Sequence, residues 1–302
     1  MISLVVHGGA WDIPDDVRED HKRGLLRALK SSWAVLASGG SAVDAVEDAI
    51  RIMEDDETFD AGRGSCINAA GDVELDAGIM NGKTLRAGAV AAVQNIKNPI
   101  SLARKIMDES EHILLVGAGA TRFAREHGVK TCRQDDLITD RELQRWRLAQ
   151  GKKNSTTKDS FRRKDTAFGT VGAVAMDKFG NIASGTSTGG TPNKFPGHVG
   201  DSPLIGSGTY ADNEVGGVST TGWGEAMIKV VMAKSVIDLM DRNGGDPEKA
   251  VKDGIKLLER KTDGRGGLVA LNNEGRVGIA YNTPRMARGY MNPEMKSPFV
   301  SV

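Results

Sequence analysis

Hydrophobic positions along the chain form short runs that alternate with longer stripes at helical spacing. Residues 2–6 are mostly apolar and precede a His-Gly-Gly sequence, which predicts a short buried strand that ends in a sharp turn. Residues 17–36 carry apolar side chains on one helical face, and the glycine pair at 39–40 ends that helix. A second helix begins at Ser41, whose spacing from Asp44 is that of a capping box.

This alternation continues up to a break near residue 150. Residues 150–165 are polar and basic and contain almost no apolar side chains. Such a segment cannot bury enough surface to offset the entropy lost on ordering, so it is predicted to be a flexible linker. The elements predicted before the linker are strands at 72–75, 88–93 and 113–116, and helices that begin after Pro99 and at 117.

After the linker the chain becomes rich in β-type residues. Residues 170–176 and 182–188 flank a turn at 177–181 and predict a β-hairpin, which a glycine-rich stretch at 189–224 follows. Paired strands that alternate with helices predict sheet layers covered by helices. The last elements predicted are helices at 225–240 and 247–260, and a hairpin of 268–271 with 277–281.

Composition narrows the class of protein. The chain has 302 residues, of which 40 are basic and 40 acidic, and this balance argues against a nucleic-acid binder, which carries a clustered basic excess. Two cysteines, Cys66 and Cys132, are too few for a disulfide framework and offer no zinc-ligand spacing. Without a signal peptide or an apolar stretch of the ~20 residues needed to span a bilayer, a cytoplasmic protein with no membrane partner is expected.

Thr170 is the first candidate for chemistry, because it opens a strand just after the linker. If the chain breaks between Gly169 and Thr170, the threonine gains a free α-amine beside its hydroxyl group. An α-amine has a pKa near ~8 and can act as the base that activates such a hydroxyl. The alternative is that Thr170 is an ordinary β-branched residue of a sheet.

Two hydroxyl-rich stretches favour a catalytic role for Thr170 over that of an ordinary strand residue. Residues 186–190 (TSTGG) end the partner strand of the hairpin, so their hydroxyl groups lie near Thr170 if neighbouring strands are ~4.8 Å apart. Residues 219–224 (STTGWG) come just before a predicted helix, where a hydroxyl and a backbone N–H suit an oxyanion hole. Ordinary turn chemistry is the alternative for each stretch alone.

Seven short motifs occur in one order along the chain, and together they identify a family. They are HGGA at 7–10, AGRGS at 61–65, ELDA at 74–77, GTVGAVA at 169–175, the turn at 177–181, TSTGG at 186–190 and GDSPLIG at 200–206. On these motifs the chain resembles, over essentially its whole length, the plant-type L-asparaginase/isoaspartyl-peptidase family of N-terminal-nucleophile hydrolases.

The resemblance implies a fold and a maturation step. The expected fold is α+β, a single domain built as a four-layer αββα sandwich of the N-terminal-nucleophile hydrolase type. Self-cleavage through an N→O acyl shift would yield an α chain, residues 1–169, and a β chain, residues 170–302. Relatives assemble as a dimer of αβ units, so a homo-oligomer is expected here, and the expected substrates are L-asparagine and β-aspartyl (isoaspartyl) dipeptides.

The resemblance also implies the roles of particular residues. Thr170 would be the nucleophile, and Thr188 would hydrogen-bond to it. Asp201 would hold the α-amino group of the substrate. The oxyanion hole would consist of Thr221 and Gly222. The full set of expected substrate-binding residues is His198, Asp201, Thr221, Gly222 and Gly224. No cofactor is expected for catalysis, but the loop between Met53 and Gly64 corresponds to one that binds a structural sodium ion in relatives, through backbone carbonyl groups.

One position departs from the family pattern. Where the family places an arginine for the substrate's α-carboxylate, this chain has His198. Arginine offers a permanently charged bidentate donor, whereas histidine offers a single donor and partial charge at neutral pH. A weaker hold on free amino-acid substrates is one expectation, an incidental loop role for His198 is the other, and Lys194 or Arg63 could compensate.

Alternatives to the asparaginase function follow from the same motifs. A glycosylasparaginase-like enzyme usually carries Asp directly before the threonine, whereas Gly169 stands here, and threonine aspartases carry long insertions that this chain lacks. A non-catalytic homologue that is never cut is the third alternative. The remaining histidines are scattered along the chain and are interpreted as core, cap or surface residues: His7, His21, His112 and His127.

Overall fold

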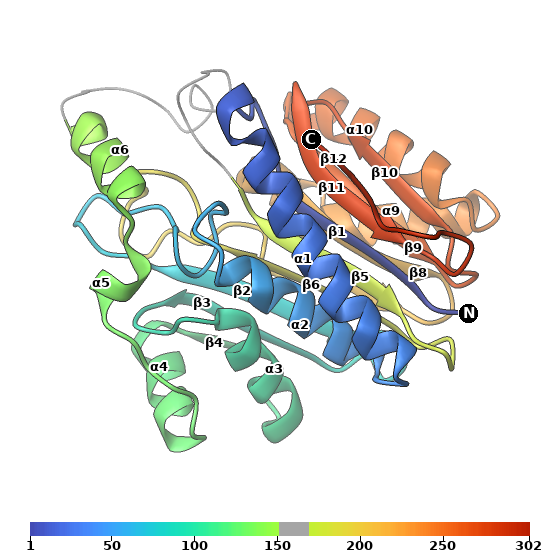
Figure 1. Ribbon diagram of the computed structural model, residues 1–302, viewed down its shortest axis with the longest axis horizontal. Coiled ribbons are helices and arrows are strands. Elements are labelled where there is room, and N and C mark those ends of the chain that lie inside the picture. Colours follow the sequence, from blue (N-terminus) through green and yellow to red (C-terminus); the bar gives the residue numbers. More distant parts are fainter. Residues whose placement is uncertain (151–168) are drawn as a thin grey trace.

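The computed structural model describes residues 1–150 and 169–302 (Figure 1). These residues form a mixed α/β fold in which helices pack against two β-sheets. The linker predicted at 150–165 lies outside the described residues, except for Gln150, which ends α6 (Asp140–Gln150). None of the helices in the two described stretches is long and apolar enough to cross a membrane.

The larger sheet places the strand that follows residue 170 near its middle. Neighbouring strands are antiparallel, apart from one parallel pair, β3 with β4. Because β5 lies between β1 and β6, it is hydrogen-bonded along both sides. The order of the eight strands is β12 (Phe299–Ser301), β11 (Arg285–Met291), β1 (Ser3–Trp11), β5 (Val171–Met176), β6 (Ile182–Thr188), β2 (Leu75–Asn81), β3 (Ala87–Val93) and β4 (Leu114–Val116).

The smaller sheet packs on the larger one. Strands β8 and β9 contact β1 and β5, and β7 contacts β6. An apolar cluster that includes Val5, Val174, Ile182 and Leu271 fills the space between the sheets. All neighbours in this sheet are antiparallel, in the order β10 (Val277–Tyr281), β9 (Gly266–Asn272), β8 (Gly216–Gly222) and β7 (Thr209–Asp212).

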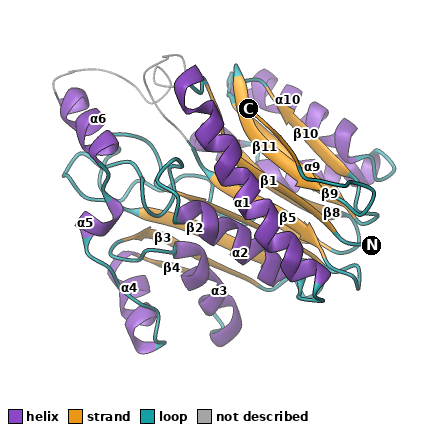
Figure 2. Ribbon diagram, in the orientation of Figure 1, coloured by secondary structure: helices purple, strands orange, loops and turns teal. Residues whose placement is uncertain are grey.

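Helices lie against each sheet (Figure 2). The larger sheet is contacted by α1 (Arg18–Ala37), α2 (Ala42–Glu54) and α3 (Pro99–Glu109), and the smaller sheet by α9 (Met232–Arg242) and α10 (Pro247–Thr262). The remaining helical elements are η1 (Asp15–Val17), α4 (Gly117–Glu126), α5 (Gln134–Leu137) and α8 (Gly224–Lys229).

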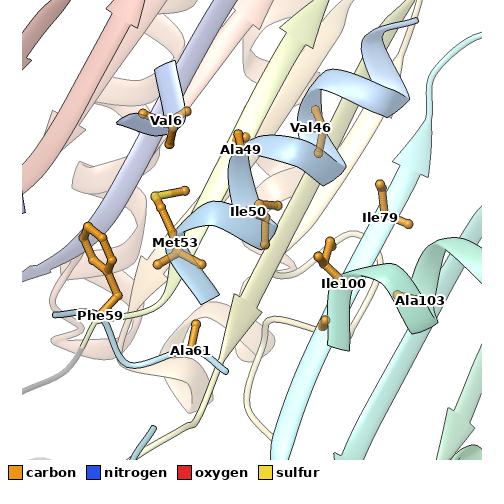
Figure 3. Packing of buried hydrophobic residues seen from close by; sticks show 14 of the residues in the cluster. Val6, Val46, Ala49, Ile50, Met53, Phe59, Ala61, Ile79, Ile100 and Ala103 are labelled. Carbon is orange, nitrogen blue, oxygen red and sulfur yellow. The ribbon is translucent and has the colours of Figure 1, made fainter. Parts of the chain in front are cut away.

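Helix α2 supports the hairpin of β5 and β6 from one side. The capping box predicted from the sequence is confirmed, since Asp44 N–H donates to Ser41 Oγ at 3.1 Å and Ser41 N–H to Asp44 Oδ2 at 3.2 Å. The apolar face of the helix, with Val46, Ile50 and Met53, is fully buried toward these strands (Figure 3). Each such side chain stabilises the fold by roughly 1.5–3 kcal/mol, so the packing of α2 helps to hold the hairpin in place.

Three predicted elements are wrong in their extent. The strand predicted at 2–6 does not end in a turn at the His-Gly-Gly sequence but continues to Trp11, because its pairing with β11 resumes at Ala10 after a register shift that follows His7. The strand predicted at 72–75 begins only at Leu75, because Asn68 holds the chain before it in a turn: its Oδ1 accepts from Asp72 N–H at 3.0 Å. The helix predicted at 225–240 is two helices, α8 and α9, separated by Val231 in the left-handed region at φ 48°. The break lets Ala233 N–H, in the first turn of α9, donate to Ser207 O at 3.1 Å.

Candidate active site

Thr170 and Thr188 face each other at the end of the central hairpin. Thr170 comes directly before β5, and Thr188 is the last residue of β6. The register pairs Val171 with Ser187, so the next residues outward are opposite each other. The Thr170 hydroxyl donates to Thr188 Oγ1 at 3.1 Å, and Gly190 N–H donates to the same oxygen at 3.0 Å. The hairpin predicted from the sequence therefore brings the two threonines together.

A single pocket collects the predicted site residues from both sheets. The larger sheet contributes Thr170 and Thr188, and the smaller sheet contributes residues at the end of β8 and the start of α8. The predicted residues that line this pocket are Thr170, Thr188, His198, Asp201, Thr221, Gly222 and Gly224. Glu225 also lines it, although the sequence carried no signal that separated this glutamate from other first-turn acids of helices.

Two glycines of the pocket lie where space is short, and one of them excludes any side chain. Gly222 has φ 140°, and a Cβ there would lie 2.4 Å from Gly266 Cα, which no side chain tolerates. A Cβ at Gly224 would lie 3.0 Å from Asp201 Oδ1. The absent side chains therefore let β8 turn beside its neighbour and leave room for the Asp201 carboxyl group.

Asp201 is a buried acid with one strong local partner. Its side chain is 4% exposed, and Thr220 Oγ1 donates to Asp201 Oδ2 at 2.7 Å. Burial raises the pKa of Asp201 to about 6, against the opposing effect of the Thr220 hydrogen bond. A cationic group of a ligand would favour the ionised carboxyl group, so Asp201 suits an ammonium partner.

His198 is engaged within the pocket by Glu225. Its Nε2 lies 2.9 Å from Glu225 Oε1, and this hydrogen bond is the largest cause that lowers the pKa of the glutamate. His198 Nδ1 is buried and has no hydrogen-bond partner among residues 1–150 and 169–302. The pocket thus contains two carboxyl groups, those of Asp201 and Glu225. The imidazole of His198 is already hydrogen-bonded to Glu225.

The peptide bonds before and after Thr170 each accept a hydrogen bond through the carbonyl oxygen. Asp60 N–H donates to Gly169 O at 3.3 Å, and His7 Nδ1 lies 3.1 Å from Thr170 O. Asp60 O in turn accepts from Gly189 N–H at 2.9 Å, which ties the loop of Asp60 to the end of β6. Sequence reasoning missed both Asp60 and His7, because contacts between distant segments create their roles.

The Asp60 carboxyl group is buried next to the peptide bond between Gly169 and Thr170. Cys66 N–H donates to Asp60 Oδ1 at 2.7 Å, and the Cys66 thiol donates to Oδ2 at 3.2 Å. Burial raises the pKa of Asp60 to about 6, and the charge of Glu142 adds to this effect. Burial also raises the pKa of the Cys66 thiol, so the sulfur keeps its proton and remains the donor.

Comparison with known proteins agrees with this geometry. The sequence profile of the family described as asparaginase matches residues 1–300. The chain belongs to the asparaginase family. Isoaspartyl peptidase/L-asparaginase from Xenopus laevis is 43% identical over 284 residues, 94% of this chain and 90% of that protein. The protein of the same name from Bos taurus is 44% identical over 94% of this chain and 91% of its own length, and that from Homo sapiens is 44% identical over 90% and 87%.

Neither cationic residue named as a substitute for the family arginine lines the pocket of this asparaginase-family chain. Arg63 pairs with Glu57 at 3.1 Å and donates to Asp136 O at 3.0 Å, beside a different cavity. Lys194 is 5% exposed, and its Nζ donates to Glu74 O at 2.9 Å. The structure leaves His198 as the basic side chain of the pocket among the described residues.

The loop at 53–64 brings backbone carbonyl oxygens close to its two glycines. A Cβ at Gly64, φ 92°, would lie 2.6 Å from Glu57 O and 2.9 Å from Phe59 O, and one at Gly62 would lie 2.5 Å from Glu54 O. Backbone carbonyl oxygens are ligands that an alkali-metal ion accepts, and of these three Glu54 O already accepts a hydrogen bond from Arg63 N–H at 2.8 Å. The Glu54 side chain does not join them as an anion, because burial raises its pKa to about 8, and no cluster of three acidic, His or Cys side chains suited to a metal occurs in the described stretches.

We predict that Asp60→Asn stabilises the chain at neutral pH. Since the folded-state pKa is raised from 3.8 to about 6, the folded state binds more protons, and the wild type loses stability as pH rises through that window. Asn keeps an acceptor for Cys66 N–H but cannot ionise. Both proteins compared carry Thr170→Ala, so that only uncut chain is measured. The free energy of unfolding of the double variant Asp60→Asn/Thr170→Ala should exceed that of Thr170→Ala by up to about 3 kcal/mol at pH 7 and by little near pH 4.

Urea titrations at several pH values check this prediction. Asp246→Asn is the matched control, because Asp246 caps α10 at the surface and Asn caps helices equally well. It should change the free energy of unfolding by less than about 0.5 kcal/mol. A gain from Asp60→Asn that is the same at pH 4 and pH 7 would contradict the proposed cause.

Proposed function

We propose that the chain is a self-processing amidohydrolase that hydrolyses L-asparagine and β-aspartyl (isoaspartyl) dipeptides through Thr170. The observation that carries this proposal is the hydroxyl contact of Thr170 with Thr188 in a pocket that also holds Asp201, in a chain of the asparaginase family. The relatives named isoaspartyl peptidase/L-asparaginase indicate the substrate class. No observation favours a glycosylasparaginase-like, threonine-aspartase-like or uncut non-catalytic protein.

The proposed fold is the four-layer αββα sandwich of N-terminal-nucleophile hydrolases. It is supported by the contacts of α1 to α3 with the larger sheet, of the two sheets with each other, and of α9 and α10 with the smaller sheet. A cut before Thr170 would leave an α chain, residues 1–169, and a β chain, residues 170–302. The two chains would stay joined through two strand pairings. Strands β5 and β6 of the β chain pair with each other, β5 also pairs with β1 of the α chain, and β6 also pairs with β2 of the α chain.

The proposed self-cleavage begins with attack of the Thr170 hydroxyl oxygen on the Gly169 carbonyl carbon. The bond from that carbon to Thr170 N breaks, and the nitrogen gains a proton as the hydroxyl loses one, leaving an ester between the two residues. Water then hydrolyses the ester to a Gly169 carboxylate and a free Thr170. Asp60 N–H, 3.3 Å from Gly169 O, can stabilise the charge that develops on this oxygen.

Substrate hydrolysis would use the same hydroxyl group after the cut. The new α-amine of Thr170 takes the hydroxyl proton, and the oxygen attacks the carbonyl carbon of the substrate's side-chain amide. Thr221 and Gly222, across the pocket on β8, are the proposed donors to the oxyanion. Ammonia or an amino acid leaves, and water releases aspartate from the ester.

Asp201 and His198 are the proposed contacts for the substrate's α-amino and α-carboxylate groups. Asp201 is a buried acceptor suited to an ammonium group. His198 can offer its ring to a carboxylate only in competition with Glu225, which occupies Nε2. Two carboxyl groups in the pocket also repel a substrate carboxylate, so we infer a weaker hold on the α-carboxylate than an arginine would give.

Two further properties are proposed with this function. Backbone carbonyl oxygens of the loop between Met53 and Gly64, among them those of Glu57 and Phe59 beside Gly64, would hold a structural sodium ion, which would order the loop beside Asp60 and take no part in the chemistry. A homodimer of αβ units would cover the edge of the larger sheet. There β4 and the residue before it expose Ile113 and Val116, and an apolar sheet edge is a surface that a second copy can cover.

Self-cleavage predicts two fragments from the wild-type chain. On a denaturing gel and by mass spectrometry, fragments should meet at Gly169 and Thr170 after incubation of the purified protein. Thr170→Ala should give one uncut band because it has no hydroxyl, whereas the matched variant Thr170→Ser keeps a hydroxyl and should still be cut. A wild-type chain that stays whole would contradict self-processing.

His198→Arg should tighten substrate binding in the cut enzyme. A bidentate, permanently charged donor would lower KM for L-asparagine by about ten-fold with kcat nearly unchanged, because the same contact is made in the ground and transition states. His112→Arg makes the same exchange at the surface and is the control. If KM for both L-asparagine and a β-aspartyl dipeptide is the same in His198→Arg as in the wild type, His198 does not hold the α-carboxylate.

A further inference from the structure

His7 is a buried side chain to which the proposed reaction assigns no step. It lies in β1, is 0% exposed, and pairs with Gly172 of β5. The sequence alone predicts a core, cap or surface role for it. Its ring, however, makes hydrogen bonds to both sheets, one of them to the nucleophile residue itself.

The two contacts define the tautomer of the His7 ring. Thr170 O, 3.1 Å from Nδ1, can only accept a hydrogen bond, so Nδ1 carries the proton. Burial lowers the pKa of His7 to about 3, which keeps the ring neutral. Nε2 is therefore an acceptor. The Ser219 hydroxyl has one proton, and both His7 Nε2 at 2.8 Å and Gly185 O at 3.1 Å lie within reach as acceptors. The shorter contact assigns the proton to Nε2. Ser219 Oγ also lies 2.7 Å from Thr186 Oγ1, which extends the contact into β6.

The fold leaves a space for this arrangement at Gly172. A Cβ at Gly172 would lie 2.1 Å from Ser219 Oγ and 2.3 Å from His7 Nε2. Contacts that short do not occur, so any side chain there would displace the hydrogen bond. Gly172 lies in β5, two residues after Thr170, so the hydrogen bond of His7 to Ser219 occupies the space beside this strand.

His7 connects the two sides of the pocket. Thr170 directly precedes β5 of the larger sheet, whereas Ser219 lies in β8 of the smaller sheet, two residues before Thr221. A ring bonded to Thr170 at one nitrogen and to Ser219 at the other sets the separation between the nucleophile and the proposed oxyanion donors. Displacements of about 1 Å in such a geometry can cost ~100-fold in rate.

Cleavage makes this contact more important. Thr170 lies outside the ladder of β5, which begins at Val171. Once the bond to Gly169 is cut, Thr170 is a chain terminus, and termini fray unless they are tied down. The hydrogen bonds described for it are those of its carbonyl oxygen with His7 and of its hydroxyl with Thr188.

We propose that His7 is a positioning residue for hydrolysis, which holds the cut N-terminal Thr170 through its carbonyl oxygen at a set distance from β8. This inference rests on the proposed function, because it assumes that Thr170 is the nucleophile. His7 touches neither the substrate nor the reacting oxygen, so it acts through Thr170. Its loss should lower kcat more than it changes KM.

Two variants of His7 that carry a side-chain amide test the contributions of the two ring nitrogens separately. The amide nitrogen of Asn reaches roughly the place of Nδ1 and can still donate to Thr170 O, whereas that of Gln reaches roughly the place of Nε2. On fully cut protein, His7→Asn should keep kcat within about ten-fold of the wild type, and His7→Gln should lose about 100-fold, with KM changed less than about three-fold in both. His127→Gln is the control. In the wild type, Nδ1 of His127 also contacts a carbonyl oxygen, that of Phe123 in α4, and the substitution should change neither kcat nor KM.

The outcomes separate this inference from the proposed function. A wild-type chain that is cut but hydrolyses neither substrate would overturn the proposed function, whereas an active wild type with equal kcat for His7→Asn and His7→Gln would overturn the role of His7. If a variant fails to fold, nitrogen NMR of the ¹⁵N-histidine-labelled wild type decides. The His7 ring should be the neutral Nδ1–H tautomer from about pH 5 to 8, and an Nε2–H tautomer or a titration in that range would overturn the inference.

Discussion

The position of Thr170 at the start of β5, with a hydrogen-bonded strand on each side, is the constraint on which the site depends. Because β5 is paired with β1 and β6 together, a residue from each neighbour can reach Thr170 at the strand's end. His7 of β1 contacts its carbonyl oxygen and Thr188 of β6 its hydroxyl group. The pairing of β5 with β1, together with that of β6 with β2, would keep the fragments together after a cut. One sheet order thus serves both the proposed maturation and the proposed catalysis.

Burial of acids is the second physical theme of the site. Asp60 lies beside the bond that is proposed to be cut, and Asp201 lies in the pocket, and desolvation raises the pKa of each to about 6. Neither carboxyl group forms an ion pair with a described cationic side chain, so each lowers the stability of the fold when it ionises. Asp201 would regain a partner when a substrate's ammonium group binds, whereas Asp60 would not.

The sequence pattern was enough to predict those parts of the site that are formed by segments close together in the chain. The hairpin of 170–176 with 182–188 follows from alternation and a short turn, and it places Thr170 opposite Thr188. The capping box at Ser41 follows from spacing. Residues whose positions depend on distant segments escaped prediction: β8 runs through a glycine-rich stretch, and its strand is defined by pairing with β9. The role of His7 and the pairing of His198 with Glu225 arise only when the two sheets and the loop before β7 come together.

The central claim is that activity resides in a free N-terminal Thr170. It is tested most directly by following, in one sample of freshly purified wild-type chain, the fraction cut before Thr170 by mass spectrometry and the rate of β-aspartyl dipeptide hydrolysis over time. The account predicts that the rate rises in proportion to the fraction cut and extrapolates to zero for uncut chain. A rate that extrapolates to a substantial value for uncut chain, or stays constant while the chain is cut, would contradict it.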